Sequence, residues 1–255
     1  MDSMMLFYII IIVSLGAYFQ TVTGFGLGII VVGLTVSFDF ASIAFIAAVV
    51  SIVTLFNCVT ALIGKDVCLE KTLTILLVLG IVPGVIAGVW LLNYLSDSAR
   101  DIMQACLGMM ILISGGYLMV KTSTRSERSH ASTFLLSGVG AGLTGGLFGM
   151  AGPPLVYHLY RQPVPLEAIK TTLLAVFACT SASRTAFVFL TDGIDFKTLL
   201  VSLTCIPVVI FTTLIAKRFP PPLNVQQLRR GIFGLLALIG IYLITSASKA
   251  MFSFD

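Results

Sequence analysis

Apolar residues form long continuous runs along the whole chain, and polar residues gather in the segments between them. Most of the runs come close to the roughly 17–25 residues with which an α-helix crosses about 30 Å of hydrocarbon. The runs cover residues 4–19, 24–38, 41–63, 72–95, 102–120, 173–190, 199–216 and 228–247. This pattern predicts an all-α integral membrane protein with about 8–10 membrane segments.

Composition supports the same class of protein. Of the 255 residues, 58% are hydrophobic and 10% are charged, whereas an ordinary soluble domain has roughly 25% charged residues. A soluble core of this size could not cover so much apolar surface. No Lys or Arg precedes the first run, which therefore lacks the basic region of a cleaved signal peptide and is expected to be retained.

Charge and cysteine usage argue against several other classes. The net charge of +4 comes from basic residues spread mainly over the connecting segments, which favours a topology signal over a nucleic-acid-binding surface. The five cysteines are scattered, with no C-x-x-C spacing, so we expect neither a disulfide framework nor a metal site. No H-E-x-x-H, G-x-S-x-G or paired-carboxylate arrangement occurs, and we therefore expect no enzyme and no cofactor.

The chain contains a weak internal repeat, with matching residues at offsets of roughly 125 positions. The matches pair Gly26 with Gly149, Lys71 with Lys197, Pro83 with Pro207, and Tyr117 with Tyr242. So constant an offset favours duplication over coincidence. We therefore expect a first transmembrane repeat in residues 1–120, a cytoplasmic linker in residues 121–131 and a second repeat in residues 132–255.

The charges of the connecting segments indicate how the two halves are oriented. If each half crossed the membrane an even number of times, the basic residues would divide evenly between the two sides, which the positive-inside rule cannot orient. An odd number leaves only Arg100, Lys197 and Lys249 on the poorer side. We therefore expect inverted halves in a bacterial inner membrane, with both termini periplasmic. Five crossings per half, or three crossings plus a re-entrant hairpin made by residues 4–38 and again by 132–160, both give this parity.

Two glycine-rich segments interrupt the first apolar stretch of each half. Glycine costs about 1 kcal/mol and proline about 3 kcal/mol relative to alanine inside a helix, so both helices should break there. Paired breaks in inverted repeats point to a transporter's midplane binding site, and free amides at the start of a half-helix suit an anion. The expected hinge and binding residues are Gln20, Thr23, Gly24, Phe25, Gly26 and Gly28 in the first half, and Gly149 and Gly152 in the second. The alternative is that these glycines only permit close helix packing.

Arg184 lies inside the apolar run 173–190, where a charge costs at least about 2.5 kcal/mol. The Asp and Glu residues occupy connecting segments or the ends of runs, so none is close in sequence to neutralise it. An anionic substrate, bound bidentately by the guanidinium, would supply the missing partner. The alternative is an arginine that helix-end carbonyls satisfy or that extends to the membrane interface.

Three further polar residues are candidates for substrate binding. Alignment of the two repeats places Asn57 opposite Arg184, where it would either orient the substrate or bridge helices. Ser181 precedes Arg184 and would add a hydroxyl donor, although serine is ordinary in membrane helices. His158 follows the proline pair of the second half and would either carry a proton, supply a second donor, or have only a structural role.

The segment F-G-M-A-G-P-P of the second half, with its counterpart T-G-F-G-L-G in the first, resembles the TauE/SafE family of sulfite exporters and related anion permeases. The resemblance extends over nearly the whole chain, including its length and its duplication. It implies movement of sulfite, sulfonates or other small organic anions in bacteria. It also supports Gly24, Gly26, Gly28, Gly149 and Gly152 as hinge positions.

Together these features predict a permease or exporter that moves a small anion, such as sulfite or an organosulfonate, by alternating access. An anion channel and a non-transporting scaffold or assembly factor are the alternatives. An interior-negative potential drives a monoanion outward by about 2.3 kcal/mol per 100 mV, so export needs no coupling ion, whereas import would need one such as a proton or sodium. The expected partners are the anion and the lipid bilayer, and a homodimer is left open.

Overall fold

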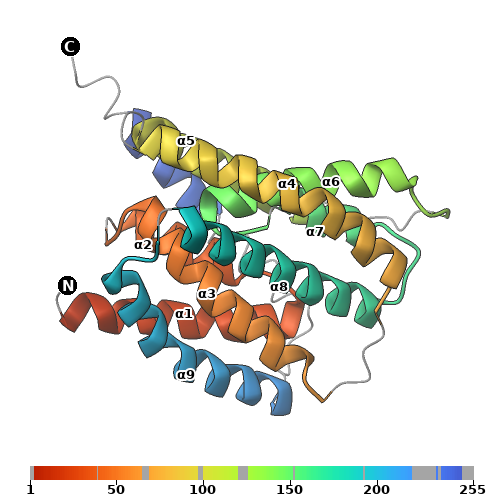
Figure 1. Ribbon diagram of the computed structural model, residues 1–255, viewed down its shortest axis with the longest axis horizontal. Helices are drawn as coiled ribbons and strands as arrows, with labels where there is room; N and C mark the ends of the chain where they lie inside the picture. The colour runs from red at the N-terminus through yellow and green to blue at the C-terminus, as the bar shows by residue number, and fades with distance from the viewer. Residues whose placement is uncertain are drawn as a thin grey trace.

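The computed structural model describes residues 3–38, 40–64, 69–96, 100–119, 126–151, 153–191, 193–219, 234 and 237–248. Within these residues the secondary structure is helical, without a β-strand, and the helices form one bundle (Figure 1). The helices are α1 (Ser3–Thr23), α2 (Leu27–Ser37), α3 (Ile43–Leu62), α4 (Lys71–Ser96), α5 (Arg100–Met119), α6 (Ala131–Phe148), α7 (Pro153–Tyr160), α8 (Leu166–Thr191) and α9 (Phe196–Arg218), followed by the helical segment Ala237–Ser248. The expectation of an all-α protein is confirmed.

The described helices have the lengths and the outer surface of a multi-pass membrane protein. Helices α1, α3, α4, α6, α8 and α9 are long and apolar enough to cross a bilayer, and three shorter apolar helical stretches, Leu27–Ser37, Asp101–Ile113 and Ala237–Ser248, accompany them. Together they fall within the about 8–10 membrane segments expected from the sequence. Large apolar side chains such as Trp90, Leu136 and Phe211 are more than half exposed, and an apolar surface of this kind is suited to lipid.

Each half begins with a helical hairpin. In the first, a Cβ atom at Gly16 of α1 would lie 3.2 Å from Leu27 Cα of α2, and the rings of Tyr8 and Phe40 stack at 5.6 Å. The two legs therefore run antiparallel, and the chain returns to the level at which it entered. Helix α1 is long enough to cross a bilayer and α2 is shorter, so the re-entrant hairpin stays a prediction.

The second hairpin closes in the same way. His158 of α7 packs against Phe134 of α6, with ring centroids 4.7 Å apart. The side chain of Gln162, just beyond α7, accepts a hydrogen bond from the Ser129 N–H and donates one to Ser129 Oγ. The chain after α7 therefore lies beside the residues that precede α6.

Helices from the first part of the chain pack against helices from the second part. Helix α1 of the first half packs on α9 of the second, α6 of the second half packs on α4 of the first, and α3 packs on its counterpart α8. Both α4 and α9 contain an internal proline, Pro83 and Pro207. In Figure 1, α1 and α9 begin at the left of the view, whereas α4 and α6 begin at the right. Helices α1 and α6 therefore run in opposite directions, as do α4 and α9.

Glycines on both helices bring α4 and α6 into direct backbone contact. The glycines recur every four residues on each helix and face one another: Gly80, Gly84 and Gly88 on α4, and Gly138, Gly142 and Gly146 on α6. A Cβ atom at any of the six would lie 2.3 to 2.5 Å from a carbonyl oxygen of the other helix. Small residues permit such close approach between membrane helices. The sequence analysis considered close packing only for the hinge glycines and missed this larger interface.

Candidate functional site

The two breaks begin with glycines of the same backbone conformation. Gly24 follows α1 with φ 85°, and Gly149 follows α6 with φ 70°. Each N–H donates to the carbonyl four residues earlier, that of Gln20 at 2.8 Å and that of Gly145 at 2.9 Å. A positive φ is costly for any residue with a Cβ atom, which is why glycine ends both helices.

The breaks meet each other inside the bundle. A Cβ atom at Gly28, in the first turn of α2, would lie 2.6 Å from Met150 Cβ in the second break, and one at Gly149 would lie 2.5 Å from the Ala47 carbonyl oxygen of α3. Gly24 is packed less closely against Lys170, with Lys170 Cα 3.2 Å from the position of a Cβ atom. The glycines therefore fit both interpretations of the sequence: they break the helices, and they also permit close packing.

A small cavity lies where the breaks meet. Its volume, measured as the space open to the centre of a water-sized sphere, is about 20 Å³, which is enough for about one water molecule. The cavity is therefore nearly closed in this conformation. Its lining residues are Gln20, Phe25, Gly26, Gly28, Ile29, Thr54, Gly149, Met150, Ala151, Val156, Phe177, Thr180 and Ser181.

Residues at the start of α2, Gly28 and Ile29, line the cavity. The first intrahelical bond is donated by the Ile30 N–H to the Gly26 carbonyl at 3.0 Å, and the Leu27 N–H donates to Gln20 Oε1 at 3.2 Å. For the N–H groups of Gly28 and Ile29, the described residues supply no acceptor. Such amides at a helix N-terminus attract an anion.

Three residues with hydroxyl groups, Thr54, Thr180 and Ser181, also line the cavity. Thr54 is 5% exposed, and its Oγ1 has no hydrogen-bond partner within the described part of the chain. In contrast, Thr180 lines the same cavity but donates its hydroxyl to the Val176 carbonyl of its own helix at 2.8 Å. Ser181 lies beside it and is 4% exposed. Among the described residues, the Thr54 hydroxyl is therefore buried without a partner, whereas the Thr180 hydroxyl is already used within its own helix.

Arg184 does not line the cavity but lies one helical turn beyond Ser181. It is 2% exposed; Nε donates to the Gly146 carbonyl oxygen at 2.9 Å, and Nη1 donates to Ser51 Oγ at 3.2 Å. The Gly146 carbonyl belongs to the last turn of α6, where carbonyls lack intrahelical partners and the helix dipole is negative. This arrangement accounts for a buried charge without a carboxylate. Direct substrate binding by Arg184 stays a prediction.

Asn57 occupies the corresponding place in the first half and bridges helices. Its Nδ2 lies 3.2 Å from the Ala17 carbonyl oxygen, 3.1 Å from Thr21 Oγ1 and 2.7 Å from Thr213 Oγ1. The side chain is fully buried and does not line the cavity. Of the two roles left open by the sequence, these contacts correspond to joining α1, α3 and α9.

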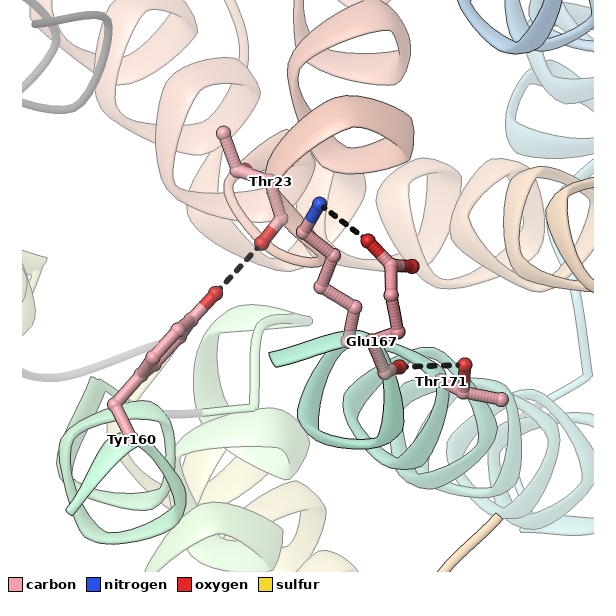
Figure 2. A network of polar contacts seen from close by, with 5 residues as sticks. Thr23, Tyr160, Glu167 and Thr171 are labelled. Carbon is pink, nitrogen blue, oxygen red and sulfur yellow. Dashed lines mark hydrogen bonds and ion pairs between the residues drawn. The ribbon is translucent and has the colours of Figure 1, made fainter. Parts of the chain in front are cut away.

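The remaining candidates are placed differently by the structure. Thr23 and Gly24 lie beside the cavity and not in its lining. Figure 2 shows the Tyr160 hydroxyl donating to the Thr23 carbonyl oxygen, a bond of 3.0 Å that ties the end of α1 to α7. His158 faces Phe134, away from the lining residues. Gly152 lies outside the described residues.

Sequence reasoning missed Thr54 and Ser51. Thr54 lies one turn before Asn57 on α3, so the two polar residues share a face of the helix. That spacing was the sequence signal by which Thr54 could have been found. Ser51 lies one further turn earlier, and its bond to Arg184 could not be read from a sequence separation of 133 residues. Among the described residues, no group of three or more His, Cys, Asp or Glu side chains could hold a metal ion.

Comparisons with known proteins agree with this architecture. No solved structure matches the chain. A protein from Cupriavidus necator named "Probable sulfite/organosulfonate exporter TauE" is 43% identical over 235 residues, which cover 92% of each chain. The model of the family described as "Sulfite exporter TauE/SafE" matches residues 8–243. Both findings support a membrane transporter and not an enzyme. This chain belongs to the TauE/SafE sulfite exporter family.

Proposed function

We propose that the protein carries a small sulfur-containing oxyanion, sulfite or an organosulfonate, across the bacterial inner membrane by alternating access. The observation that carries this proposal is the cavity between the breaks, where two N–H groups of α2 and the Thr54 hydroxyl have no partner within the described residues. Donors without competing acceptors suit an oxyanion, which has only acceptor atoms. The name of the Cupriavidus relative supports the same class of substrate.

Inverted halves with both termini periplasmic are the orientation that we infer. The start of α3, at Ala44 and Phe45, lies beside the end of α8, at Val188, around one groove. These two helices are counterparts in the repeat and both have spanning length, so their antiparallel course supports inversion. Three crossings and one re-entrant hairpin per half then satisfy the odd parity that the basic residues favour.

Movement of the halves would open the nearly closed cavity to one side at a time. Paired broken helices at a repeat interface allow such rocking about a fixed site. The membrane potential contributes about 2.3 kcal/mol per 100 mV to the outward movement of a monoanion, so we propose export without a coupling ion. Proton or sodium coupling and a homodimer stay predictions.

Flux into proteoliposomes tests this function. Purified protein is reconstituted, and radiolabelled sulfite, thiosulfate, taurine and sulfoacetate are offered with and without an imposed potential. We expect saturable movement of at least one of these anions, chemically unchanged, that accelerates when the destination side is positive. Flux that rises linearly with concentration would indicate a channel. Absence of flux for every anion from folded protein would contradict the transporter proposal and favour the scaffold.

A further inference from the structure

Helices α3 and α8 pack against each other, and the same faces of both line two separate spaces. One space is the cavity between the breaks, and the other is a groove of about 240 Å³ near the start of α3, the end of α8 and the start of α9. Residues three or four positions apart share a helix face, so each face can be followed from groove to cavity. In that order the residues are Ala48, Ser51 and Thr54 on α3, and Val188, Arg184 and Ser181 on α8.

Ser51 and Arg184 occupy the interval between these spaces. They are 1% and 2% exposed, and no residue lines both the groove and the cavity. The bond from Arg184 Nη1 to Ser51 Oγ joins the two helices across this interval, while Nε is held by the Gly146 carbonyl of α6. Along both helices, the Arg184–Ser51 hydrogen bond therefore lies between the residues that line the cavity and those that line the groove.

We propose that Ser51 and Arg184 form a gate through which the anion passes between the cavity and the groove, an inference that rests on the proposed transport function. An anionic oxygen is a stronger acceptor for a guanidinium N–H than a serine hydroxyl is. An anion arriving from the cavity displaces Ser51 from Nη1, while the bond from Nε to Gly146 keeps the guanidinium in the path. The exposed Asp195 carboxylate in the groove repels the anion and favours its release there.

Cysteine accessibility tests the gate without depending on transport. Ala48→Cys places a thiol at the groove and Thr54→Cys places one at the cavity, each in the full chain in lipid vesicles. A membrane-impermeant thiol reagent that carries a sulfonate is added to each side in turn, and the unaltered chain gives the background from native cysteines. We expect Ala48→Cys to react from one side, and Thr54→Cys to react about tenfold more slowly from that side.

Breaking the gate should make the cavity thiol accessible. Adding Arg184→Ala or Ser51→Ala should raise the reaction rate of Thr54→Cys from the groove side about tenfold, because a charge-assisted hydrogen bond is lost. Asn57→Ala is the matched control, since Asn57 holds the corresponding position in the other half and should leave this rate unchanged. Ser51→Ala removes only one oxygen atom and keeps the test available if Arg184→Ala fails to fold.

Two results would overturn the gate. One is the absence of any reaction at Ala48→Cys from either side, and the other is an unchanged Thr54→Cys rate in folded Ser51→Ala or Arg184→Ala protein. Gel filtration and thermal unfolding establish that each variant is folded. Absence of anion flux would instead remove the proposed function while leaving these reaction rates interpretable, so the two failures are distinguishable.

Discussion

The two breaks offer different groups to an anion, although they occupy equivalent places in the two halves. At the first break, the first turn of α2 contains Gly28 and Ile29, which line the cavity and whose N–H groups have no acceptor among the described residues. At the second, α7 begins with Pro153 and Pro154, which have no N–H to donate. The second break contributes instead the Gly146 carbonyl, which holds a buried arginine beside the cavity.

The residues that the repeat alignment pairs on α3 and α8 follow the same division. Asn57 and Arg184 both donate to the final turns of the first helix in their own half, but only one of them is charged. The first half thus supplies dipoles and the second half a full positive charge. The comparison teaches that a duplicated fold can diverge around one asymmetric ligand, because a single small anion needs only one compensating charge.

Removal of the charge should have the largest effect on binding. A positive charge about 6 Å from an anion contributes about 3 kcal/mol at an effective dielectric constant of about 20, so Arg184→Ala should raise the sulfite Kd about 100-fold. Equilibrium binding of radiolabelled sulfite to folded protein provides the measurement. Asn57→Ala, its counterpart, should change the Kd less than about threefold, because a neutral amide carries no net charge. Equal losses in the two variants would contradict the division between the halves.

A substitution that forces the two breaks apart should have the next largest effect on transport. Gly28→Ala places a Cβ atom 2.6 Å from Met150 Cβ, and overpacking of this kind costs about 1–3 kcal/mol. Sulfite flux should fall about tenfold or more, and Tm should fall with it. The double variant Gly28→Ala with Met150→Gly removes the clashing atom and should recover most of the flux.

Gly149→Ala in the second break should differ from Gly28→Ala, because the added Cβ atom meets backbone and not a side chain. Its Cβ atom would meet the Ala47 carbonyl oxygen at 2.5 Å, in a residue with φ 70°. Because the conflict is with backbone, no side-chain substitution should restore the Tm of this variant. Recovery of Tm by shortening a neighbouring side chain would show that the backbone contact does not limit this position.

Loss of the Gln20 amide should weaken the first break moderately. Gln20 Oε1 accepts a hydrogen bond from the Leu27 N–H, and Gln20 Nε2 donates one to Cys58 Sγ at 3.2 Å. In Gln20→Leu the Leu27 N–H loses its acceptor, and an unpaired buried group costs about 1–3 kcal/mol. We expect a lower Tm and a sulfite Kd about tenfold higher, both measured by thermal unfolding over a sulfite titration. Gln20→Glu should be worse, because a carboxylate repels the anion.

The smallest effect should come from the two threonines of the cavity. Thr54→Val removes a hydroxyl without a partner in the described residues and should raise the sulfite Kd about fivefold, from the loss of about 1 kcal/mol of hydrogen bonding to the ligand. Its Tm without sulfite should not fall. The Thr180 hydroxyl already donates to the Val176 carbonyl oxygen, so Thr180→Val should leave the sulfite Kd unchanged. A reversed order of the two Kd values would contradict the assignment of Thr54.

Much of the membrane architecture could be predicted because it depends on local sequence. A run of about 20 apolar residues must cross or bury itself in hydrocarbon wherever it occurs, and Gly24 and Gly149 end their helices through their own φ angles. The polar partners could not be predicted, because hydrogen bonds join residues far apart. Arg184 donates to Gly146 and Ser51, from two other helices, and its direct contact with an anion stays a prediction.

The glycines of α4 and α6 show where information in the local sequence ends and information in the tertiary structure begins. The spacing of four residues in Gly80–Gly84–Gly88 and in Gly138–Gly142–Gly146 is visible in the sequence, and it indicates helix packing in a membrane. Which helix each stripe meets is decided only when the halves come together. The sequence by itself determined the class of protein and the two breaks, since hydropathy and backbone strain are properties of short segments. The tertiary structure decided the hydrogen-bond partners of the buried arginine and the place of Thr54 in the cavity lining, since these depend on which surfaces pack together.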